Sequence, residues 1–112
     1  MKIKDVLVPM DFSPTSIRAL EFAAGLVDPS GEIYLLHVID ADFVTNLEEA
    51  GFDSADGAVE RLRRRAEVRM EELLQHWSGR SPGVQTMVVI GKPVTEVLRV
   101  ASDLDFEMIV IA

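Results

Sequence analysis

Asp11 is the residue with the clearest capacity for binding chemistry, because it directly follows a short apolar segment and precedes several hydroxyl-bearing residues. A carboxylate at the carboxyl end of a strand can accept two hydrogen bonds from a ribose diol or one from an amino group. The same carboxylate suits an Asx turn or a helix cap, a role that aspartate fills in many loops. The residues alone leave both roles open for Asp11.

Ser13, Thr15 and Ser16 offer hydroxyls and backbone amides at the start of an expected helix. A helix N-terminus favours an anion, so this segment can hold a phosphate. The alternative, which we favour, is that Ser13 caps the helix with Pro14 in its first position. The segment lacks the G-x-x-x-x-G-K-[ST] pattern and is therefore not a P-loop.

Three further places carry side chains that could bind a ligand or a metal, or act in catalysis. Gly91-Lys92-Pro93 can bring a cation close to nucleotide phosphates, but the same tripeptide is ordinary turn chemistry before a helix, and we favour the turn. His37 stands among leucines of an apolar segment, and His76 stands beside Trp77. Neither histidine has metal-ligand spacing or a recognisable nucleophile partner, so we interpret both as structural.

Composition limits the classes of function. The 112 residues carry eleven Lys and Arg against nineteen Asp and Glu, which gives a formal charge of −8 and argues against nucleic-acid binding. The absence of cysteine excludes disulfides, thiolate catalysis and cysteine-rich zinc sites. We find neither a membrane-spanning apolar segment nor a signal peptide. A cytoplasmic protein without a membrane partner is expected.

The elements that must position these residues alternate along the chain. Val6, Leu7 and Val8 form an apolar run typical of a strand buried on both faces. The apolar runs predict strands at 4–10, 32–40, 84–90 and 108–112. Helical spacing predicts helices at 58–77 and 94–102, and a first helix that begins at Pro14, has its apolar positions at 17–27 and is ended by 28–31. A long surface excursion is expected at 41–57.

Strand and helix alternation predicts one α/β domain over residues 1–112, a parallel-sheet three-layer α/β/α sandwich. In such a sheet, ligands bind at the carboxyl ends of the strands where the strand order reverses.

Two charged or aromatic surfaces stay open to more than one interpretation. On the helix at 58–77, Glu60–Arg64 is an attractive pair at four-residue spacing, whereas Glu67–Glu71 and Arg65–Arg69 repel. We interpret this helix face as solvated, with a partner-docking patch as the minority alternative. The excursion at 41–57 contains Phe43, Leu47 and Phe52 among acids, which fits a flexible lid, part of a dimer surface, or a loop that packs its aromatic side chains onto the core.

Four segments in order resemble the universal stress protein family: Val6–Ser13, Leu35–Val38, Gly91–Pro93 and Met108–Ile111. The resemblance implies a flavodoxin-like or adenine-nucleotide α-hydrolase-like sheet of five parallel strands, usually in a homodimer. Many members of the family bind ATP and others do not. The implied nucleotide-binding residues are Pro9, Met10, Asp11, Phe12, Ser13, Val38, Gly91 and Ala112.

The family's phosphate segment, a G-x-x-G followed later by G-[ST], would come after the fourth strand and is not in the sequence. We therefore expect residues 1–112 to be a C-terminally incomplete domain that lacks the final helix and strand. The apolar run that ends at Ala112 would also leave an unprotected sheet edge.

The leading hypothesis is a cytoplasmic stress-response regulator that binds an adenine nucleotide, ATP with magnesium or AMP. No catalytic constellation is visible, so at most slow ATP hydrolysis is expected. The alternative is a dimerisation or partner-docking module of the same fold that binds no nucleotide. An enzyme of the wider adenylating superfamily is a weaker hypothesis, because Pro9–Ser16 supplies no phosphate motif.

Overall fold

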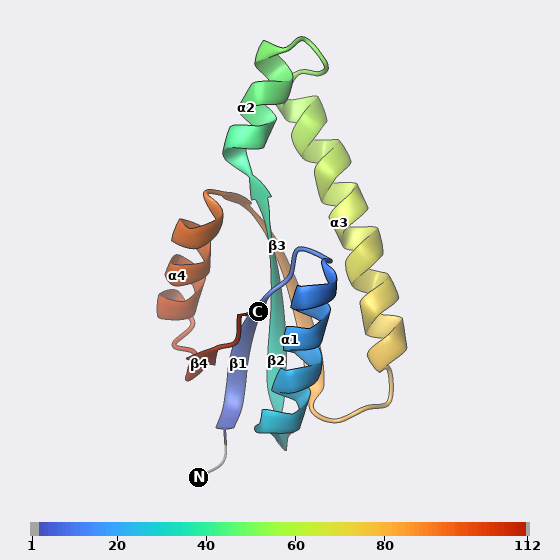
Figure 1. Cartoon of the computed structure of the whole chain (residues 1–112), viewed down its shortest axis with the longest axis vertical. Helices are drawn as coiled ribbons and strands as arrows, with labels where there is room; N and C mark the ends of the chain where they lie inside the picture. The colour runs from blue at the N-terminus through green and yellow to red at the C-terminus, as the bar shows by residue number, and fades with distance from the viewer. Residues whose placement is uncertain (1–2, 112) are drawn as a thin grey trace.

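The computed structural model describes residues 3–111 as a parallel sheet with helices on both faces (Figure 1). The strands are all parallel and run in the order β3-β2-β1-β4. In chain order the elements are β1 (Ile3–Pro9), α1 (Pro14–Leu26), β2 (Val27–Asp40), α2 (Ala41–Glu49), α3 (Ala55–Trp77), β3 (Gly83–Gly91), α4 (Pro93–Asp103) and β4 (Met108–Ile109).

Alternate residues of β1 serve two different cores. Val6 and Val8 pack with Leu20 of α1 and Met70 of α3 on one face of the sheet. Leu7 packs on the other face, in a second cluster with residues of β2 and α4. Figure 1 shows α1 and α3 on one side of the strands and α4 on the other. The α/β/α arrangement expected from the sequence is confirmed.

The centre of the sheet supplies much of the driving force for folding. Val6, Leu7 and Val8 are each 0% exposed. Full burial of an aliphatic side chain contributes about 1.5–3 kcal/mol, so this run alone stabilises the fold by several kcal/mol. The prediction of a strand buried on both faces is confirmed here.

The start of α1 is set by local chemistry. Ser13 is the N-cap, its hydroxyl accepts a hydrogen bond from the Ser16 N–H at 3.2 Å, and Pro14 opens the helix. The predicted cap is therefore confirmed. The helix ends at Leu26, and β2 begins at the next residue.

The predicted start of the second strand at residue 32 is wrong: residues 28–31, which were expected to end the helix, already belong to β2. Asp28 accepts hydrogen bonds from the Ser30 N–H and hydroxyl at 2.8 and 2.6 Å, which satisfies these groups within a strand. The pairing with β1 also shifts register between Ile3 and Asp5, where the backbone of Gly31 closely approaches Lys4. The turn-forming residues at 28–31 therefore lie at the irregular part of the β1–β2 pairing and not in a loop.

The surface excursion expected at 41–57 is helical over most of its length instead of loose. Residues Ala41–Glu49 form α2, which begins after Asp40, whose carboxylate accepts a hydrogen bond from the Asp42 N–H at 2.9 Å. Val44 is buried against Ile39 of β2 and Ala58 of α3. Figure 1 shows α2 and the start of α3 projecting together from one end of the sheet.

Smaller boundaries differ as well. Helix α3 starts at Ala55, three residues earlier than expected, because Ser54 caps it through the Gly57 N–H at 3.0 Å. Strand β4 covers only Met108 and Ile109, so the predicted strand at 108–112 is shorter in the structure. Ala112 lies outside the described residues.

Strand β2 is longer than both of its neighbours, and they pair with different parts of it. β1 pairs with residues from Val27 to Leu36, and β3 pairs with residues from Glu32 to Asp40. The last four residues of β2 therefore extend past the end of β1. This offset produces a step in the sheet at the carboxyl ends of the strands.

Candidate functional site

A pocket of about 300 Å³ lies at the carboxyl ends of β1 and β2, beside the N-termini of α1 and α4. Strands β2 and β3 lie on one side of β1 and β4 lies on the other, so the strand order reverses beside β1. Ligands of open α/β sheets bind at such a reversal. The pocket is lined by Pro9, Met10, Asp11, Ser13, Thr15, Ser16, Leu36, His37, Val38, Pro93, Val97 and Ile111.

The step in the sheet presents main-chain groups to this pocket. Met10 N–H donates to the Leu36 carbonyl at 2.8 Å, so the polar groups of Leu36 face β1. Within a strand, every second residue directs its N–H and C=O to the same side. Val38 therefore directs one donor and one acceptor to the side where β1 has ended, and its side chain is half-buried in the pocket wall.

Asp11 forms an Asx turn at the edge of the pocket. Its Oδ1 accepts a hydrogen bond from the Ser13 N–H at 2.9 Å. Hydrogen bonds from the Ser13 side chain and backbone lower the pKa of Asp11 below its ordinary value of 3.8, more than burial raises it. The exposed carboxylate is held in its charged form. A carboxylate can accept about four hydrogen bonds, so Asp11 keeps the capacity to accept one from a ligand.

The hydroxyls that follow Asp11 are engaged mainly in closing the first turn of α1. Ser16 Oγ donates to the Ser13 carbonyl at 3.0 Å and lies 3.3 Å from Met10 Sδ. Thr15 and Ser13 hydroxyls are 2.9 Å apart. The capping role favoured from the sequence is the one that this geometry shows, and it leaves the positive end of the α1 dipole beside the pocket.

His37 ties the two strand ends together. Its Nδ1 lies 2.8 Å from the Met10 carbonyl oxygen, and since a carbonyl only accepts, Nδ1 is the donor. The imidazole also packs on Phe12, with ring centroids 5.1 Å apart, and the guanidinium of Arg69 lies 4.7 Å from the Phe12 centroid. Phe12 has a positive φ of 68°, a left-handed conformation that this stack holds in place.

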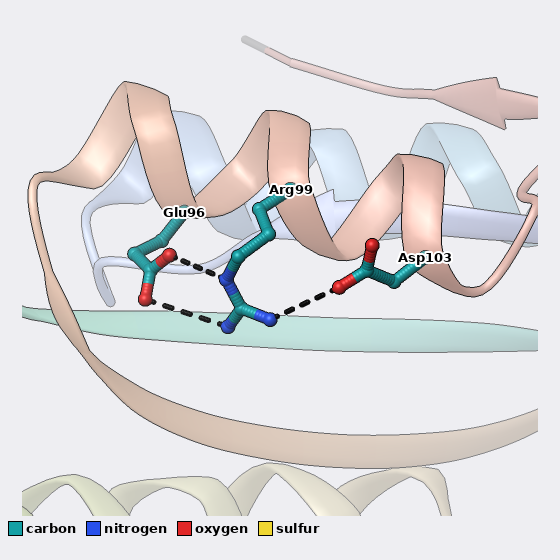
Figure 2. A network of polar contacts seen from close by, with 3 residues as sticks. All are labelled: Glu96, Arg99 and Asp103. Atoms are coloured by element: carbon teal, nitrogen blue, oxygen red, sulfur yellow. Dashed lines mark hydrogen bonds and ion pairs between the residues drawn. The ribbon is translucent and has the colours of Figure 1, made fainter.

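Gly91 does not line the pocket; its lack of a side chain makes room for the packing of Glu96. A Cβ on Gly91 would lie 2.5 Å from Glu96 Cγ, so only glycine lets this largely buried side chain lie against the strand end. Figure 2 shows Arg99 between Glu96 and Asp103, with Nε 2.7 Å from one Glu96 oxygen and Nη1 3.2 Å from Asp103. This network runs along α4 from Glu96 to Asp103, the last residue of the helix.

The structure brings five of the eight expected residues together in the pocket wall: Pro9, Met10, Asp11, Ser13 and Val38. Phe12 does not line the pocket, since it packs between His37 and Arg69. Gly91 does not line it either, because it accommodates Glu96. Ala112 lies outside the described residues.

Sequence reasoning did not place Leu36, His37, Val97 and Ile111 in the pocket. Leu36 and His37 directly precede Val38 in the chain, so their position in the strand was an available signal. Val97 and Ile111 come from α4 and from the segment after β4, and no local pattern links them to the site.

Within residues 3–111, no group of three or more His, Asp or Glu side chains is placed to hold a metal ion. The same range contains no helix that is both long and apolar enough to cross a membrane.

Comparison with protein families gives a match over residues 2–112 to the model of the universal stress protein family. The chain belongs to the universal stress protein family. The order of the four resembling segments in the sequence pointed to the same family, and the confirmed sheet agrees with it. Comparison with curated proteins gives no significant match.

Solved structures of similar fold include two related at more than a quarter sequence identity. The hypothetical protein MJ0577 is 26% identical with a TM-score of 0.83, over 99% of this chain and 75% of that chain. The hypothetical protein PH0823 is 29% identical with a TM-score of 0.74, over 95% and 76%. Universal stress protein UspA from Lactobacillus plantarum is 18% identical with a TM-score of 0.79, over 98% and 77%, and supports the fold.

Proposed function

We propose that this universal stress protein binds an adenine nucleotide in the pocket at the ends of β1 and β2, and acts as a stress-response regulator in the cytoplasm. The observation that carries the proposal is the position of Val38, whose main-chain N–H and C=O face the pocket beyond the end of β1. Asp11 supplies a charged acceptor in the same pocket wall.

These groups match the polar edge of an adenine nucleoside. Adenine presents an acceptor nitrogen beside an amino donor, which pair with a main-chain N–H and C=O. Its ribose diol donates to a carboxylate such as Asp11. The apolar remainder of the wall, including Pro9, Leu36 and Val97, suits the faces of the base. The volume of about 300 Å³ lies at the lower end of the range for small-molecule sites.

Magnesium would enter with the nucleotide phosphates, because Mg²⁺ is commonly held by phosphates and water with few protein ligands. The positive ends of α1 and α4 lie beside the pocket and favour an anion there. The function supported is therefore binding and sensing of a nucleotide.

The test is calorimetric titration of ATP with magnesium into the 112-residue chain, compared with GTP and 2′-deoxy-ATP. Guanine reverses the donor and acceptor order of adenine, so GTP should bind about tenfold or more weakly than ATP. Removal of the 2′-hydroxyl should also weaken binding, by about tenfold if Asp11 accepts from it.

Asp11→Asn separates the ligand role of Asp11 from its turn role. The asparagine Oδ1 can still accept from the Ser13 N–H, so the turn is kept while the charged acceptor is lost. We expect this variant to bind ATP more weakly and to lose the preference for ATP over its 2′-deoxy form. Asp40→Asn is the matched control, because Asp40 accepts from the Asp42 N–H in the same way outside the pocket. Equal affinity for ATP and GTP, or no binding by a folded chain, would refute the proposal.

A dimerisation module is the second candidate, and exposed apolar side chains favour it. On α4, Val94 and Leu98 are 73% and 59% exposed, and Ile111 after β4 is 69% exposed. Such a surface suits a second copy of the chain. Sedimentation velocity of the chain and of Leu98→Glu tests this candidate: a dimer that the variant dissociates supports it, and a monomer at high concentration rules it out.

A further inference from the structure

Strand β3 forms one outer edge of the sheet and carries none of the usual protection against pairing. Its nine residues, Gly83–Gly91, include no charged residue and no proline. Natural proteins normally protect an edge of this length with charges, proline or a bulge. Within residues 3–111, β2 is the sole strand that pairs with β3. Its outer backbone groups are therefore available to another strand.

The side chains of β3 show the same lack of cover. No residue of β3 is fully buried, although five of the nine are Val, Met or Ile. By contrast, Val6, Leu7 and Val8 of the central strand β1 are completely buried. The composition of β3 is typical of an inner strand, yet β3 lies at the edge of the sheet and stays partly exposed along its whole length.

A groove lies along this edge, between α3 and β3. Its floor and walls are Met70 and Leu74 of α3 with Thr86 and Val88 of β3, and its rim carries Glu67 and Glu71. Neither glutamate has a hydrogen-bond or ion-pair partner in the described part of the chain. The carboxylates of Glu67 and Glu71 repel each other because they lie four residues apart on one helix. A cation between or beside them would reduce this repulsion.

We propose that β3 and this groove bind an extended segment of a partner protein that pairs with β3 as an added strand and carries basic residues at alternate positions. Main-chain hydrogen bonds would supply the pairing, as in other cases of strand addition. The basic side chains would lay their aliphatic stems on Met70 and Leu74 and place their charges beside Glu67 and Glu71.

The spacing of the two carboxylates sets the expected motif. Residues four apart on a helix are separated by about 6 Å along the axis. Alternate residues of a strand are about 6.7 Å apart. Two basic residues separated by one residue therefore match the glutamate pair. Charge also selects against a second copy of the chain, which would bring its own Glu67 and Glu71 and a net charge of −8. The groove shares no lining residue with the nucleotide pocket.

The probe is a fluorescein-labelled synthetic peptide with the core Val-Lys-Val-Lys-Val, compared with Val-Glu-Val-Glu-Val and Val-Lys-Pro-Lys-Val. Fluorescence anisotropy should show binding of the lysine peptide to the 112-residue chain, at least about tenfold tighter than the glutamate peptide. The proline peptide keeps both charges and should bind weakly, because proline removes a backbone donor and disfavours a central strand position. Amide hydrogen exchange should slow within Gly83–Gly91 when the lysine peptide is bound.

Charge reversal gives the decisive comparison. Glu67→Lys/Glu71→Lys should lose affinity for the lysine peptide and prefer the glutamate peptide, and the milder Glu67→Gln/Glu71→Gln should weaken lysine binding without reversal. Glu72→Lys is the matched control, since Glu72 is exposed on the same helix but does not line this groove. Equal binding of both peptides, protection away from β3, or self-association of the free chain through β3 would overturn the proposal.

Discussion

At the residue scale, Asp11 has a measurable electrostatic role in the folded chain whether or not a nucleotide is bound. Its pKa is lowered from 3.8, first by the Ser13 side chain and then by the Ser13 backbone N–H. A carboxyl group whose folded pKa is depressed stabilises the fold above its unfolded pKa. That contribution is lost as the pH falls from the unfolded pKa through the lower folded one.

We therefore expect Asp11→Asn to be less stable than the original chain at about pH 7, and the difference to narrow at about pH 3. Urea unfolding of both proteins at the two pH values measures this. Asp40→Asn serves as the comparison, because Asp40 also accepts a hydrogen bond from the backbone N–H two residues further along the chain, at the start of α2. A stability difference that stays constant with pH would mean that the charge of Asp11 does not support its turn.

At the scale of single elements, the pairing of β1 with β2 depends on Gly31. A Cβ on Gly31 would overlap the backbone carbonyl of Lys4, which cannot move without separating the strands. Gly83, in β3, offers a matched site, since a Cβ there would meet only Glu32 Cγ at 3.9 Å.

Gly31→Ala should lower the free energy of unfolding by about 3 kcal/mol, at the upper end of the cost of overpacking. Gly83→Ala should change it by less than about 1 kcal/mol, because alanine fits without a clash and is favoured over glycine in a strand. Chemical unfolding of both variants compares them directly. Equal effects would show that the close approach of Gly31 to Lys4 does not constrain the sheet.

The same elements show what a sequence can and cannot reveal. The run of Val6 to Val8 predicts its own burial, and Ser13 with Pro14 predicts the helix start, because both depend on neighbouring residues only. Helix α2 was not predicted because it is short, with nine residues, and buries a single side chain, Val44. Asp11 and Val38 were placed in the site through strand ends, whereas Val97 of α4 and Ile111 after β4 reach it through tertiary packing, which no local pattern encodes.

At the scale of the whole molecule, stability is distributed unevenly along its length. The molecule measures 51 × 28 × 20 Å, and α2 with the start of α3 forms one end of the long axis. This end is held by a small cluster around Ile39, Val44 and Ala58, whereas the strands share the larger clusters. Regions with few buried apolar contacts open locally at lower free energy than the global unfolding.

Val44→Ala should accelerate amide hydrogen exchange throughout α2 while leaving exchange in β1 nearly unchanged. Leu20→Ala, in the main core, should instead lower protection in all strands together, by about 2–5 kcal/mol of unfolding free energy. Exchange followed by mass spectrometry resolves the two patterns. A uniform loss of protection in Val44→Ala would show that the projecting end unfolds only with the rest.

The step in the sheet, where β2 extends past the end of β1, also affects how the sequence of this protein can change in evolution. Because that step is built by an offset in strand pairing, the pairing itself presents the main-chain N–H and C=O of Val38 to the pocket, and the Val38 side chain is not needed for it. The turn at 50–53 joins α2 to α3 at the projecting end of the molecule, so it can be lengthened or exchanged while the step in the sheet stays intact. Related proteins can therefore differ in the projecting end formed by α2 and the start of α3 while they keep the same step in the sheet.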